Sequence, residues 1–294
     1  MAEYFTDKEY GKRPRNIEEI DERVWAGLVT LIRMRIDDGT FGYRFPLRCP
    51  DGNAAYGCDE HAFKRILSVE VPWLDWPPAI DEVPETPVIL DLLVFCAEAA
   101  GKPISDGHHG YFNHDHLRWD RGPGLESFAA DVNRLFARSG VGFEMKADGG
   151  IQRLMPEAFA EIVGWTVYQT GDNETDALLE RSMRLIKSAK IDDRKDGLEK
   201  IWDAFERIKT IEPGANKKVQ AEALLDRVAT SGSRFRQELG TEASALTSIG
   251  NTFRIRHSET GQENLSRPEH LDYLFFRMLS FIQLALKTTG RTTS

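Results

Sequence analysis

The last part of the chain limits its fold more than any other segment. Apolar side chains recur between residues 268 and 288 at a spacing of three or four residues, so they cover one wide stripe of a helix. They are Leu271, Leu274, Phe275, Met278, Leu279, Ile282, Ala285 and Leu286. A stripe this wide is typical of a helix at the centre of a bundle, where several neighbours contact it.

The sequence before this helix predicts further helices that can pack against it. Four more stretches have helical spacing of apolar residues, and they begin ETDALLERSM, RKDGLEKIWD, NKKVQAEALL and RFRQELGTEA. The tripeptide GDN at 171–173 interrupts the pattern, and we place a domain boundary there. Residues 171–294 are therefore predicted to form a helical bundle, and residues 1–170 a separate domain.

The first domain has a mixed pattern. Asn16, with Glu19 three residues later, predicts the start of a helix. The apolar run at 88–100 predicts a buried helix, and the polar run at 102–124 predicts a long loop. VGFEM and IQRLM flank KADGG, which predicts a small β-hairpin near 141–155. The predicted fold class is mainly α, with a mixed N-terminal domain followed by the bundle.

Charge is distributed unevenly between the two parts. The chain of 294 residues has a net charge of −9, and 41% of its residues are hydrophobic, which is enough for a packed core. Residues 1–170 carry 18 Lys+Arg against 28 Asp+Glu, and residues 171–294 carry 20 against 19. The acidic first part repels phosphate. We therefore expect no DNA partner, whereas the second part can make a local RNA contact.

The sequence also bears on the compartment. The start MAEYFTDKEYGKRPRN lacks the apolar segment of a signal peptide, and no apolar run is long enough to span a bilayer. The three cysteines, Cys49, Cys58 and Cys96, are an odd number without an export signal. We expect a cytoplasmic protein with reduced thiols and no membrane partner.

A charged segment joins the last two predicted helices, and it contains Arg254, Arg256, His257 and Glu259. Arginine binds phosphate oxygens through two N–H groups, and histidine can move a proton near neutral pH. These residue types can therefore cleave RNA, with His257 acting on the ribose hydroxyl or the leaving oxygen. The alternative is a structural role, in which the arginines neutralise nearby carboxylates.

Four segments resemble AbiJ-type abortive-infection proteins. FRIRHSE at 253–259 resembles the F-R-I-R-H-x-E stretch before the aromatic-rich last helix of that family. RKDGLEKIWDAFERIKTI at 194–211 is similar to a helix of the same family. The stretches at 5–32 and 128–145 resemble the start and the helix-to-hairpin segment of AbiJ N-terminal domains. The four segments also follow one another in the family's order.

The resemblance implies a role in bacterial defence against phage and a HEPN-like C-terminal domain. HEPN domains are often metal-independent endoribonucleases and act as dimers, so the resemblance implies a homodimer that acts on RNA without a cofactor. Arg254, Arg256, His257 and Glu259 are then the candidate catalytic residues. The family motif has four to six residues between its arginine and histidine, whereas Arg254 and His257 have two between them. The alternative is a non-catalytic RNA- or protein-binding module with a degenerate HEPN site.

A second group of candidates consists of His108, His109, His114 and His116, four histidines within nine residues. Imidazole nitrogens bind transition metals, and alternating His114 and His116 share one side of an extended segment. No cysteine lies nearby in the sequence, and the spacing matches no zinc motif. We therefore favour a packed loop of aromatic residues and histidines, with no metal. The alternative is a metal-dependent enzyme centred on these histidines.

A third group is Cys49, Cys58 and His61. The C-x8-C-x2-H spacing supplies three metal ligands, and the fourth ligand must come from elsewhere. The alternative that we favour is a pair of reduced, partly buried thiols.

Overall fold

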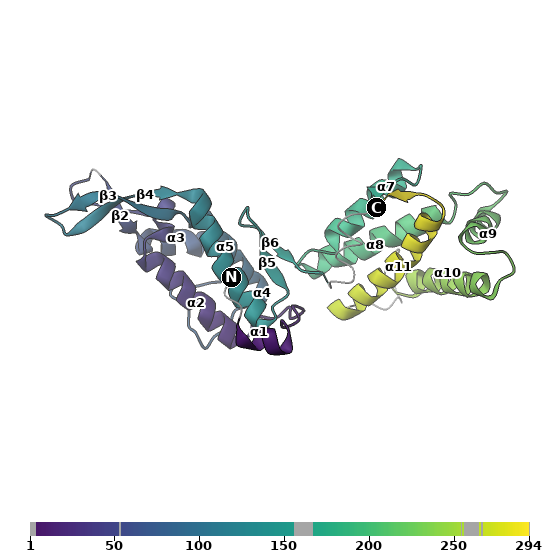
Figure 1. Ribbon diagram of the computed structural model, residues 1–294, viewed down its shortest axis with the longest axis horizontal. Helices are drawn as coiled ribbons and strands as arrows, with labels where there is room; N and C mark the ends of the chain where they lie inside the picture. Colours follow the sequence, from purple (N-terminus) through teal and green to yellow (C-terminus); the bar gives the residue numbers. More distant parts are fainter. Residues whose placement is uncertain are drawn as a thin grey trace. The chain divides into compact units, whose positions relative to one another are not determined.

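The computed structural model describes residues 4–52, 54–155, 167–253, 255, 265 and 267–293. The chain divides into two compact units, Met1–Leu154 and Met155–Ser294 (Figure 1). This boundary lies earlier than the predicted one at 170/171. The reason is that strand β7 (Val167–Tyr168) pairs with a strand near the C-terminus, and Tyr168 is buried in the core of the second unit.

The N-terminal unit combines helices with short antiparallel strands. Its elements are α1 (Phe5–Tyr10), α2 (Glu22–Asp37), the 3-10 helix η1 (Thr40–Tyr43), β1 (Pro46–Arg48), β2 (Ala55–Cys58), α3 (Glu60–Glu70), α4 (Thr86–Ala99), β3 (Lys102–His109), β4 (His114–Asp120), α5 (Arg121–Ser139), β5 (Phe143–Met145) and β6 (Ile151–Arg153).

The start of α2 differs from the prediction. The helix begins at Glu22 and not near Asn16, because the Asp21 carboxylate accepts a hydrogen bond from the backbone N–H of Val24. Ile17 instead forms a parallel β-bridge to Val141, so the chain is extended where the helix was expected. The hairpin predicted near 141–155 is confirmed by the pairing of β5 with β6.

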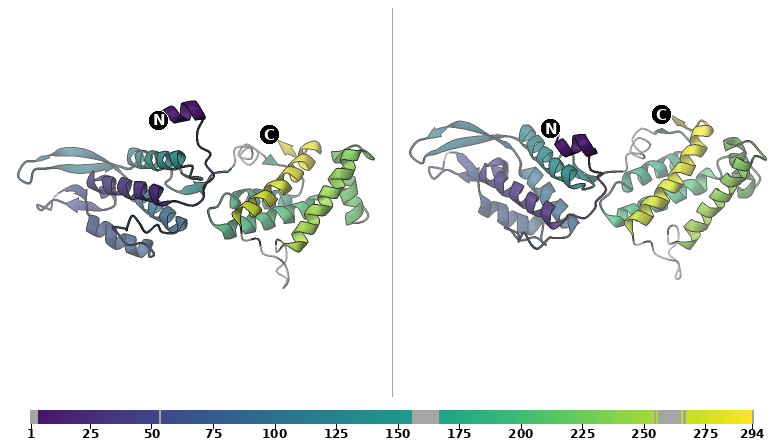
Figure 2. Two further views of the ribbon diagram at one scale, coloured as in Figure 1. Left: turned by 90° about the horizontal axis from the view of Figure 1, so that it is seen from below. Right: turned by 60° about the horizontal axis from the view of Figure 1, so that its bottom comes forward.

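The segment predicted as a long loop at 102–124 is mostly a β-hairpin, so that prediction is wrong. Strands β3 and β4 pair with each other and complete a four-stranded antiparallel sheet in the order β1-β2-β4-β3. The base of the hairpin packs on η1, where the Trp119 indole N–H donates to the carbonyl of Gly39 at 2.8 Å. The far end of the hairpin extends beyond the ends of α2 and α5, as both views in Figure 2 show.

Close packing at the hairpin base explains two glycines. A Cβ atom on Gly42 would lie 2.4 Å from the Trp119 ring, and one on Gly124 would lie 2.2 Å from the backbone of Gly101 and Lys102. Both glycines therefore let η1 and the first turn of α5 approach the base of the hairpin more closely than any other residue would allow.

The C-terminal unit consists almost entirely of helices. Its elements are β7, α7 (Asn173–Leu185), α8 (Ile191–Ile208), α9 (Lys217–Val228), α10 (Arg234–Thr252), α11 (Pro268–Thr288) and β8 (Thr292–Thr293). The five helices predicted from the sequence are confirmed.

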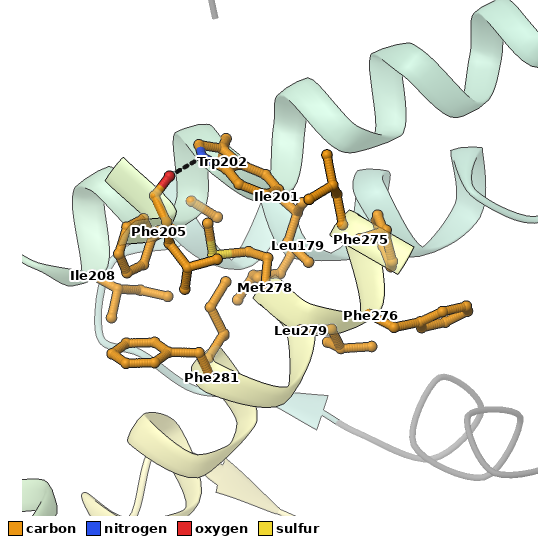
Figure 3. Packing of buried hydrophobic residues seen from close by; sticks show 14 of the residues in the cluster. Leu179, Ile201, Trp202, Phe205, Ile208, Phe275, Phe276, Met278, Leu279 and Phe281 are labelled. Atoms are coloured by element: carbon orange, nitrogen blue, oxygen red, sulfur yellow. Dashed lines mark hydrogen bonds between the residues drawn. The ribbon is translucent and has the colours of Figure 1, made fainter. Parts of the chain in front are cut away.

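The core of this unit lies between α7, α8 and α11 (Figure 3). The rings of Phe205 and Phe281 meet edge to face, with 5.6 Å between their centroids. The buried Trp202 indole donates to the carbonyl of Leu246 at 3.0 Å, which attaches α10 to the core. Gly250 makes this contact possible, because a Cβ atom there would lie 2.5 Å from the Trp202 ring.

The fold is thus mainly α, with a mixed N-terminal unit that contains a small antiparallel sheet. Every helix in the described ranges is too short or too polar to cross a lipid bilayer.

Candidate metal centre

The predicted catalytic residues cannot be placed in the structure. Arg254, Arg256, His257 and Glu259 all lie outside the described residues. They follow α10 and precede α11 in the chain, and their proposed chemistry stays a prediction. The second group of candidates, the histidines of the β3–β4 hairpin, is described in full.

Strand pairing brings three of the four histidines to one face of the sheet. His109 lies directly opposite His114, and Gly107 lies opposite His116. Directly paired residues project to the same face, and alternate residues of one strand do so too. His109, His114 and His116 therefore share a face, which confirms the predicted alternation of the last two.

A β-bulge selects the histidine of β3 that joins this face. The register shifts between Ser105 and Gly107, so Asp106 is an extra residue in β3. Without the bulge, the pairing from Ser105 onward would place His108 opposite His114. Gly107 has φ +130°, a conformation that side-chain-bearing residues rarely adopt.

His108 lies outside the group and has its own partner. It pairs across the strands with Asp115, and its Nδ1 lies 2.9 Å from Oδ1 of that carboxylate. The Ser105 hydroxyl donates to the second carboxylate oxygen at 2.8 Å. The hydrogen bonds from His108 and Ser105 lower the pKa of Asp115. This polar pair is half exposed to solvent and has no other candidate ligand with it.

The turn between β1 and β2 supplies a cysteine to the three histidines. The Cys49 N–H donates to the carbonyl of Ala54, and the Cys49 carbonyl accepts from the N–H of Gly52, so the turn fixes the residue. The buried Sγ lies 3.4 Å from Nδ1 of His109. The Asp51 carboxylate, from the same turn, lies 3.6 Å from that nitrogen.

The four side chains form a compact donor set. One ligand atom each from Cys49, His109, His114 and His116 lies within 4.8 Å of the other three. Nε2 of His114 and Nε2 of His116 are buried, and neither has a hydrogen-bond partner among the described residues. A buried polar nitrogen without a partner costs free energy. Coordination of a cation by these nitrogens would remove that cost.

Aromatic rings surround the histidines. The Tyr56 ring stacks on His114 with 4.0 Å between centroids and 8° between planes. The Phe112 ring also lies parallel to His114, at 5.9 Å, and meets His109 edge to face at 5.1 Å. These contacts fix the plane of the imidazole, so they pre-organise its nitrogen for a ligand.

The electrostatics of the group favour neutral imidazole. Burial lowers the pKa of His114, and the neighbouring His109 and His116 lower it further. Burial raises the pKa of the Cys49 thiol, and the Asp51 carboxylate adds to that shift. Neutral imidazole is the form that binds metals, and a bound cation would itself deprotonate the thiol.

The donor set has the number and type of ligands of a tetrahedral transition-metal site. With Zn–N distances near 2.0 Å and Zn–S near 2.3 Å, the ligand atoms of a zinc site lie roughly 3.3–3.6 Å apart. The Cys49–His109 distance of 3.4 Å already meets this condition. Cys58 and His61 do not contribute, since no such group forms around them in the described part of the chain.

The ligands of this site lie far apart in the sequence. Cys49 and His109 are 60 positions apart, and only the pairing of β2 with β4 brings their strands together. The prediction that no metal binds the histidines rested on the absence of a nearby cysteine in the sequence. The fold brings Cys49 to the histidines, so the reason for that prediction no longer applies.

Comparison with protein-family models, with curated proteins and with solved structures found no match for this chain. No family is therefore assigned from these comparisons. The resemblance of four segments to AbiJ-type proteins stays a prediction from the sequence.

The bulge provides a test of the geometry. Valine at Gly107 is strained at φ +130°, at a cost of about 1–3 kcal/mol, or else forces the hairpin into a register that removes His109 from the group. We expect Gly107→Val to raise the dissociation constant for Zn²⁺ by about tenfold or more. Titration against a chelating dye of known affinity measures the change.

Gly110→Ala is the matched control. Gly110 lies in the same hairpin, its φ is not positive, and a Cβ atom there meets nothing within 4 Å. The affinity of the Gly110→Ala protein for Zn²⁺ should stay close to that of the unaltered chain. Equal affinities for the Gly107→Val and Gly110→Ala proteins would contradict the role assigned to the bulge.

Proposed function

We propose that the N-terminal unit binds one Zn²⁺ ion through Cys49, His109, His114 and His116. The observation that carries this proposal is the convergence of four ligand atoms within 4.8 Å. Two of the four residues, His114 and His116, each have a buried Nε2 without a hydrogen-bond partner among the described residues. Three imidazoles and one thiolate suit zinc better than magnesium or calcium, which prefer oxygen ligands.

The proposed role of the ion is structural. Four protein ligands fill a tetrahedral coordination sphere, and catalytic zinc sites usually keep one position open for water or substrate. The burial patterns of β3 and β4 contain no fully buried residue, so the hairpin has little apolar packing of its own. An ion would join the end of this hairpin to the β1–β2 turn.

Elemental analysis of the purified full chain tests this proposal. Protein loaded with Zn²⁺ and then desalted should carry about one equivalent of zinc, whereas Cys49→Ala and His116→Ala should carry less than about a tenth. His108→Ala is the matched control and should keep its zinc, because His108 is a neighbour in the hairpin that faces Asp115. Circular dichroism establishes that each variant is folded.

Either of two results would contradict the zinc site. One is a well-folded unaltered chain that holds less than about a tenth of an equivalent of Zn²⁺, Co²⁺, Ni²⁺ or Cu²⁺. The other is an equal loss of zinc from the His108→Ala and His116→Ala proteins.

We further propose that the chain acts in bacterial abortive infection, through action of its C-terminal unit on cellular RNA as a homodimer. The support is the sequence resemblance of four segments to AbiJ-type proteins. A helical C-terminal unit is what a HEPN-like domain requires, and the charged segment with Arg256 and His257 lies between its last two helices. The second interpretation is a non-catalytic RNA- or protein-binding module.

RNA cleavage distinguishes these two interpretations. If the segment is catalytic, the purified chain should cleave tRNA or total RNA with EDTA present, because the predicted site uses no metal. Arg256→Ala and His257→Ala should each abolish cleavage, typically a loss of about 10²-fold or more for a general acid–base residue. Retention of RNA binding without cleavage would favour the non-catalytic module, and absence of both would contradict an action on RNA.

A further inference from the structure

We infer that Cys49 is a site of oxidation by hydroperoxides and that its oxidation releases the bound metal ion. This inference rests on the zinc site proposed above. Among the four ligands of that site, Cys49 has a sulfur atom that a hydroperoxide oxidises, whereas the three histidines do not. The reactant is hydrogen peroxide or another small, neutral hydroperoxide.

The chemistry of the donor set singles out the sulfur. Imidazole nitrogens coordinate zinc without being readily oxidised, whereas a thiolate transfers two electrons to a peroxide. A cysteine that coordinates zinc does so as the thiolate, and Cys49 supplies the sulfur of the donor set. Metal binding therefore creates the nucleophile that peroxide oxidises.

The other two cysteines lack this activation. Cys58 and Cys96 are both buried and belong to no group of candidate ligands in the described residues. Burial raises the pKa of Cys58 to about 12 and that of Cys96 well above its ordinary value. Both therefore stay protonated and inert at neutral pH, so oxidation should be selective for Cys49.

The turn that follows Cys49 is exposed to solvent at Asp51 and Gly52, although Cys49 itself is buried. An open cavity of about 530 Å³ is lined by Arg48, Ala54 and the ligand His116, and Cys49 is not among its lining residues. The oxidant must therefore be small, and hydrogen peroxide is scarcely larger than water.

The reaction step is balanced without a further reactant. The Cys49 thiolate attacks one oxygen of the peroxide, so an S–O bond forms as the O–O bond breaks. The sulfur loses two electrons and, with the transferred OH group, becomes a sulfenic acid, while the second oxygen of the peroxide leaves as hydroxide. The neutral sulfenic acid is a poor ligand, so three imidazoles remain and the affinity for zinc falls.

Cys58 lies too far from the oxidised sulfur to form a disulfide with it. Cys58 pairs with Pro46, at the opposite end of the β1–β2 ladder from Cys49. Three residues of strand separate those positions, which is about 10 Å. A disulfide requires Cα atoms within about 7 Å of each other. We therefore expect an external thiol such as glutathione to reverse the oxidation.

The experiment uses the zinc-loaded full chain and hydrogen peroxide. A chelating dye records zinc release, and mass spectrometry of proteolytic peptides locates added oxygen. We expect zinc release together with one added oxygen on the Cys49 peptide and none on the peptides of Cys58 and Cys96. Glutathione should restore zinc binding.

Cys49→Asp is the matched variant, because a carboxylate is a zinc ligand that peroxide does not oxidise. Its zinc should leave at least about tenfold more slowly in peroxide than that of the unaltered chain. If this variant does not fold, the oxidised peptides of the unaltered chain still decide the question.

The two proposals fail in different ways. A chain that carries no zinc before peroxide is added contradicts the metal site, and the oxidation proposal with it. A chain that carries zinc and keeps it in peroxide, with Cys49 unmodified, overturns the oxidation proposal alone. Earlier oxidation of Cys58 or Cys96 also overturns it.

Discussion

In the β3–β4 hairpin, His109 lies directly opposite His114, and this pairing depends on one extra residue at the bulge before Gly107. The bulge moves His109 to the face that His114 and His116 already occupy, and it leaves His108 to pair with Asp115 on the other face. The neighbouring pairing of β2 with β4 then brings the turn that holds Cys49 to the same group. One register therefore determines which side chains can bind a metal.

The C-terminal unit and the β3–β4 hairpin of the N-terminal unit differ in how much apolar surface they bury. The C-terminal unit buries aromatic and aliphatic side chains from α7, α8 and α11 in one core, and the hydrophobic effect accounts for its packing. The β3–β4 hairpin has no such core, since none of its strand residues is fully buried. A coordinated ion can hold it where apolar burial does not, which is the usual role of structural metals in small β-elements.

The sequence predicted the helices of the C-terminal unit because each one carries an apolar stripe that the core buries. It predicted a loop at 102–124 because polar and aromatic residues lie on both faces of the hairpin, so period-two alternation is weak. The alternation of His114 and His116 was predictable, but the contribution of Cys49 was not. That contact needs the order of strands in the sheet, which is a long-range property. The predicted helix start at Asn16 failed for a similar reason, the bridge from Ile17 to Val141.

X-ray absorption at the zinc edge reports the identity and distance of the ligand atoms themselves. For the zinc-loaded full chain, we expect one sulfur at about 2.3 Å and three imidazole nitrogens at about 2.0 Å. A shell of oxygen and nitrogen atoms without sulfur, or six-fold coordination, would contradict the assignment of Cys49, His109, His114 and His116 as the ligands.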